Sequence, residues 1–127
     1  MAPDYPAKGK KPNKKESPRA ALARAVDAFT RLPFPERSTD DAADILHAEL
    51  LLFDSAVGDT LLTILNGDWV PREEVKPNSD LRQQLTAQAE SDNPTAAADA
   101  RSYLEYLDAL ETLLELASAV VIKHPKK

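Results

Sequence analysis

The sequence predicts an all-α protein, namely a helical bundle of two long helices and two shorter ones, preceded by a disordered basic N-terminal tail. Residues 39–66 and 94–124 carry apolar side chains at helical spacing, and each stretch is long enough for a helix of about 40 Å. The chain has only three glycines, and its ten prolines fall outside these stretches except at a first-turn position. That distribution is typical of helices joined by stiff connectors.

The composition excludes several classes of protein. The chain has no cysteine, so disulfides, thiolate metal sites and cysteine nucleophiles are ruled out. No apolar run approaches the roughly 18 residues that a membrane span needs, and residues 1–6 lack the apolar core of a signal peptide. We therefore expect a cytoplasmic protein that does not bind membranes.

Charge is distributed unevenly along the chain, although the net charge is only −5. Residues 1–19 sum to +4, residues 20–122 to −12 and residues 123–127 to +3. Residues 1–16 show no apolar periodicity, so they are expected to be disordered. The sequence therefore predicts a basic tail over 1–16, one helical domain over 17–124 and a basic C-terminal tail over 125–127.

The first helix is expected to begin at Pro18, because Ser17 is a good N-cap and proline suits the first helical position. Apolar side chains recur at helical spacing until the prolines of the 32–36 connector end the segment. Leu32 and Phe34 are expected to anchor this connector on the bundle.

The second helix is expected to begin after Ser38 or Thr39 and to end at Asn66-Gly67. Its main apolar seam consists of Leu46, Leu50, Phe53, Val57 and Ile64. A second set, Leu51, Leu62 and Leu65, lies on nearly the opposite arc among polar neighbours. A helix that is apolar on two sides is either central in its own bundle or shared with a partner. Because the neighbouring helices are short, we expect an exposed leucine patch in a homodimer or complex subunit.

The third helix is expected to begin at Ser79 or Asp80, and the fourth at Pro94 after an Asp92/Asn93 cap. The fourth has the best-defined apolar stripe in the chain: Tyr103, Tyr106, Leu107, Leu110, Leu113, Leu114, Ala117, Val120 and Val121. We expect the two long helices to be antiparallel, with the short helices packed across them.

Metal binding is a further alternative, because Asp44 and His47 share one face of the second helix. A di-iron bundle needs a second such pair and more inward carboxylates, and the last helix has no histidine at the matching spacing. We therefore expect a solvated His47. Glu49 projects toward the apolar seam, where it needs an ionic partner or a position at the rim. No nucleophile accompanies it, so we predict neither an enzyme nor a cofactor.

Two charged features point to partners. Asp108, Glu111 and Glu115 form an acidic ridge without any Lys or Arg three or four residues away, so the ridge is either solvated or meets a basic partner. Near the N-terminus, a basic run suits phosphate groups but has no interleaved aromatic residue for base stacking. It comprises Lys8, Lys10, Lys11, Lys14 and Lys15.

From these features we expect a non-catalytic helical protein–protein interaction or assembly module, such as a small subunit or adaptor of a larger complex. Its predicted interface is the second leucine set together with the acidic ridge. One alternative is a nucleic-acid-associated accessory protein that binds phosphate through the lysine run. The other is a metal-binding bundle that uses Asp44, His47 and Glu49.

Overall fold

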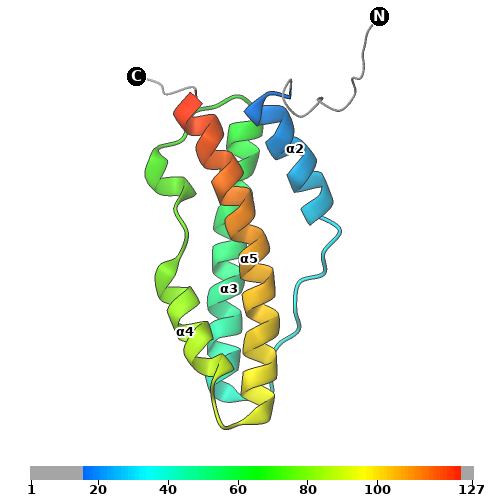
Figure 1. Cartoon of the computed structure of the whole chain (residues 1–127), viewed down its shortest axis with the longest axis vertical. Coiled ribbons are helices and arrows are strands. Elements are labelled where there is room, and N and C mark those ends of the chain that lie inside the picture. Colours follow the sequence, from blue (N-terminus) through cyan, green and yellow to red (C-terminus); the bar gives the residue numbers. More distant parts are fainter. Residues whose placement is uncertain (1–15, 124–127) are drawn as a thin grey trace, which may run out of the picture.

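The structure, a computed structural model, describes residues 16–123 and is shown in Figure 1. Its elements are α2 (Pro18–Phe29), α3 (Asp41–Leu65), the 3-10 helix η1 (Arg72–Val75), α4 (Ser79–Ala89) and α5 (Pro94–Lys123). This part of the chain holds two long and two shorter α-helices and no strand, so the predicted all-α bundle is confirmed. Apart from Glu16, the predicted basic tail lies outside the described residues.

Local capping chemistry sets most of the helix boundaries. Ser17 accepts a hydrogen bond from a first-turn N–H of α2 at 3.1 Å, and Pro18 is the first helical residue, as predicted. Asn93 caps α5 in the same way at 2.9 Å. Gly67 has a φ of 95°, and two hydrogen bonds from residues 67 and 68 close the last turn of α3. The predicted end of this helix at Asn66-Gly67 is therefore confirmed.

The start of α3 differs from the prediction, because Asp40 rather than Ser38 or Thr39 is its N-cap. The buried Ser38 hydroxyl instead donates a hydrogen bond to Asp99 of α5 at 2.5 Å. Asp40 also accepts a hydrogen bond from the side-chain amide of Asn93 at 3.0 Å. These contacts join the beginning of α3 to the beginning of α5.

The two long helices run parallel, so the prediction of an antiparallel pair is wrong (Figure 1). The N-cap of α3 meets the N-cap of α5 at one end, and Asp54 of α3 meets Tyr106 of α5 further along. The reason is that η1 and α4 return the chain along the length of the bundle before α5 begins. The short helices therefore lie alongside the long pair rather than across it.

α5 is the central helix, since it contacts α2, α3, η1 and α4, and its contacts with α2 and α4 are more extensive than those of α3. Every residue of its predicted apolar stripe is buried, which confirms that part of the core. The main seam of α3 is buried as well, except for the half-buried Phe53. Ala96, Ala97 and Ala100 are also buried near the start of α5, where small side chains permit close helix approach.

An aromatic cluster holds the irregular connector between α2 and α3. The Phe34 ring lies edge-on to the rings of His47 and Tyr106, with centroid distances of 5.2 and 4.9 Å. Phe34 thus anchors the connector as predicted, whereas Leu32 is exposed and does not. His47 is buried beneath the connector, so the expectation of a solvated His47 is wrong.

Two hydrogen bonds fix the connector backbone over this cluster. The Nε2–H of His47 donates to the Pro35 carbonyl at 2.9 Å, and the Tyr103 hydroxyl donates to the Glu36 carbonyl at 2.7 Å. Burial raises the pKa of Tyr103 to about 12. Tyr103 therefore remains a neutral hydrogen-bond donor throughout the physiological pH range.

Replacing Tyr103 with phenylalanine tests this attachment. The Tyr103→Phe variant keeps the ring but leaves the Glu36 carbonyl without its donor, so the free energy of unfolding should fall by about 1–2 kcal/mol. Urea denaturation measures the change. Thr112→Val is the control, because the Thr112 hydroxyl donates only to an exposed carbonyl within its own helix, and it should change the free energy of unfolding by less than about 0.5 kcal/mol. Equal losses would contradict this assignment.

Candidate protein-binding surface

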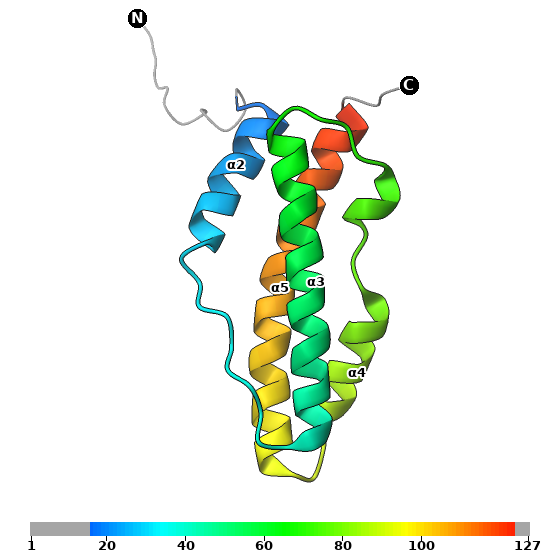
Figure 2. The ribbon, with the colours of Figure 1, turned by 180° about the vertical axis from the view of Figure 1, so that it is seen from behind.

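The outward side of α3 carries large aliphatic side chains that no other described element covers. Ile45, Leu51, Leu52 and Leu62 are 64%, 47%, 68% and 60% exposed, respectively. Figure 2 shows this helix in front, with α2 on one side and η1 and α4 on the other. At 3.6 residues per turn the four positions share one broad arc over about five turns. We call these four residues the outer apolar face.

The structure places two of the predicted interface leucines, Leu51 and Leu62, on the outer apolar face. The third, Leu65, is half-buried and packs against the core. Sequence reasoning missed Ile45 and Leu52. The sequence did contain a sign of them, because residues 50–53 are all apolar. Consecutive side chains on a helix point in different directions, so this run could not face the core as a whole. Whether these leucines form an interface stays a prediction.

Carboxylates lie among and beside the residues of the outer apolar face, and α3 contains no Lys or Arg. Asp44 accepts a hydrogen bond from Arg37 at 2.7 Å, which holds the pKa of Asp44 below its usual value. Asp41, Glu49 and Asp59 are exposed and form no ion pair with another described residue. Glu49 therefore occupies the predicted rim position rather than an ion pair. The surface is therefore apolar with negative charges interspersed.

The predicted acidic ridge on α5 is partly neutralised by a residue from α4. Arg82 donates to Glu111 at 2.8 Å and also to Asp108, and these hydrogen bonds raise the pKa of Arg82. Glu115 is exposed. The sequence interpretation missed Arg82 because it compared only neighbours within the same helix. Binding of a partner by this ridge stays a prediction.

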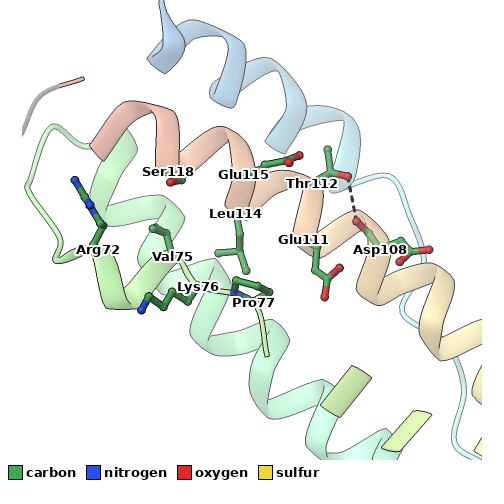
Figure 3. Close-up of a pocket in the computed structure, with 10 residues that line it drawn as sticks. All are labelled: Arg72, Val75, Lys76, Pro77, Asp108, Glu111, Thr112, Leu114, Glu115 and Ser118. Carbon is green, nitrogen blue, oxygen red and sulfur yellow. Dashed lines mark hydrogen bonds between the residues drawn. The ribbon is translucent and has the colours of Figure 1, made fainter. Parts of the chain in front are cut away.

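The ridge also forms one wall of a cleft of about 620 Å³, shown in Figure 3. Arg72 and Lys76 lie on the opposite wall, and Leu114 lies between the two walls. Charges of both signs therefore face the same space. The cleft consequently offers no strong preference for a highly charged ligand.

The residues of the metal alternative do not form a shared site. Asp44 is engaged by Arg37, and Nε2 of His47 is engaged by the Pro35 carbonyl. Glu49 lies on a different face of α3 from His47, since two residues correspond to about 200° around a helix. Among the residues that the structure describes, no group of three or more His, Asp or Glu side chains is placed to hold a metal ion.

The lysine run over 8–15 lies outside the described residues. No protein-family model, curated protein or solved structure matches this chain. Across the described helices, none combines the length and the apolar character needed to cross a membrane.

The link between α4 and α5 gives a testable consequence. In Arg82→Met the hydrogen bonds to Glu111 and Asp108 are lost, and the free energy of unfolding should fall by about 1–2 kcal/mol at low salt. The loss should shrink in 1 M NaCl, because salt screens partly exposed charges. Arg72→Met is the matched control and should change stability by less than about 0.5 kcal/mol, as Arg72 forms no ion pair with described residues. An equal effect of both substitutions in urea denaturation would disprove the link.

Proposed function

We propose that this chain is a non-catalytic helical interaction or assembly module that binds a protein partner through the outer apolar face of α3. The observation that carries the proposal is the exposure of Ile45, Leu51, Leu52 and Leu62 on one side of one helix. Single exposed apolar side chains are common, whereas several large ones on one side of the same helix are typical of a surface that a partner covers.

The core supports this proposal, because these four side chains are not part of it. Fully burying a leucine or isoleucine is favourable by roughly 1.5–3 kcal/mol. The side chains of the outer apolar face are largely exposed, so they would gain much of this free energy only when a partner covers them. A second copy is the simplest partner, since a two-fold axis would place each outer apolar face against the other. Such a homodimer, or a larger complex containing this chain, removes the leucines from water.

Truncating two of the leucines tests this function. Light scattering after size exclusion should give wild-type protein a mass above that of a monomer at both low and high salt, because salt does not weaken apolar contacts. The Leu51→Ala/Leu62→Ala variant should shift toward the monomer. Its free energy of unfolding should change by no more than about 1 kcal/mol, since both side chains are about half exposed or more.

Trp69→Ala is the control, because Trp69 is also about half exposed but lies beyond the C-terminal end of α3. This variant should keep the wild-type mass. A wild-type protein that stays monomeric at high concentration would contradict self-assembly through this face. Unfolding of the double variant would instead assign the leucines to the core.

A further inference from the structure

A groove of about 600 Å³ separates α2 from α3. α2 packs mainly on α5, and Figures 1 and 2 show it standing away from α3. Tyr106, Leu110 and Leu113 of α5 line the groove, together with Phe29 of α2 and Leu61 of α3. The groove is therefore lined by apolar side chains from three helices; it adjoins the outer apolar face and shares only Leu62 with it.

The charges that line this groove all have one sign. Asp54 and Asp59 are its only charged lining residues, and no Lys or Arg of the described chain lines it. Asp54 accepts a hydrogen bond from the Tyr106 hydroxyl at 2.8 Å, and Asp59 is exposed. An occupant of this groove must therefore combine apolar groups with positive charge.

Gly58 lines the groove at the middle of α3. A glycine inside a helix is destabilising relative to alanine. No described neighbour requires glycine here, because a Cβ placed on Gly58 would meet no atom within 4 Å. The missing side chain instead leaves room for a second backbone to approach α3 closely.

From these observations we propose that the groove binds an amphipathic helix of another protein, with apolar anchors between α2 and α3 and Lys or Arg beside Asp54 and Asp59. A helix fits because a groove between two helices accepts a row of side chains at helical spacing. A second copy is a poor occupant, since its exposed apolar helix face belongs to α3, which has no Lys or Arg to place beside Asp54 and Asp59. The lysine run over 8–15 has charge but no large apolar side chain to fill the groove.

The test uses a fluorescent peptide of about 18 residues with leucines at helical spacing and lysines elsewhere. Fluorescence anisotropy with the full chain measures its dissociation constant. Replacing every lysine with glutamate, or every leucine with serine, should weaken binding at least about tenfold. If wild-type protein does not bind the first peptide, or binds the lysine–serine peptide equally well, the proposal is wrong.

Two substitutions locate the peptide on the protein. Gly58→Gln should weaken binding at least about tenfold, because its side chain occupies the place of the incoming backbone. The control is Ala56→Gln, an exposed position on the same helix that does not line the groove, and it should bind like wild type. Equal affinities for Gly58→Gln and wild type would overturn the proposal.

Stability measurements separate blocked binding from damaged folding. Gly58→Ala and Gly58→Gln should raise the Tm by about 2–5 °C, since the position is open and both residues favour helix over glycine. If Gly58→Gln is more stable than wild type and still binds the peptide more weakly, damaged folding cannot explain the weaker binding. If Leu52→Ala weakens peptide binding and Gly58→Gln does not, the peptide occupies the outer apolar face. That result would reject the groove while leaving the proposed function intact.

Discussion

The burial of α5 is the constraint on which the rest of the structure depends. Its buried side chains run from Ala96 to Val121 and face several directions, so no single neighbouring helix can cover them. α3 covers one side, α2 with its connector covers a second, and η1 with α4 covers a third. Because α3 uses only one side for this contact and has a short neighbour on each flank, its opposite side remains in water. The exposed apolar residues of α3 thus follow from the way in which α5 is enclosed.

The sequence predicted the helices well, because caps and periodicity are local properties. Ser17, Asn93 and the Asn66-Gly67 pair give clear boundaries, and the stripe of α5 is regular enough to identify its buried residues. Helix direction was predicted wrongly, since periodicity contains no information about which way neighbours run. The burial of His47 was missed because it depends on Phe34, which lies on a connector whose path no repeating pattern defines.

The two candidate binding surfaces differ in how far the sequence revealed them. Leucines opposite the main seam of α3 indicate an exposed patch, so part of the outer apolar face was predictable. The groove was not predictable, because it depends on the angle between α2 and α3 and on residues from three helices. Gly58 gave no signal by itself, since only the structure shows open space where its side chain would be. The two surfaces meet at Leu62, so in the proposed adaptor a partner on one surface would lie directly beside a partner on the other.

The parallel direction of α3 and α5, with α2 antiparallel to both, brings Pro18 and Lys123 to the same end of the bundle. The chain segments that begin there carry +4 over residues 1–19 and +3 over residues 123–127, whereas residues 20–122 carry −12. Both basic segments of the sequence are therefore attached at the end of the bundle where α3 also ends. Leu62 consequently lies nearer to the two attachment points than Ile45 does, so the outer apolar face has one end near them and one end far from them.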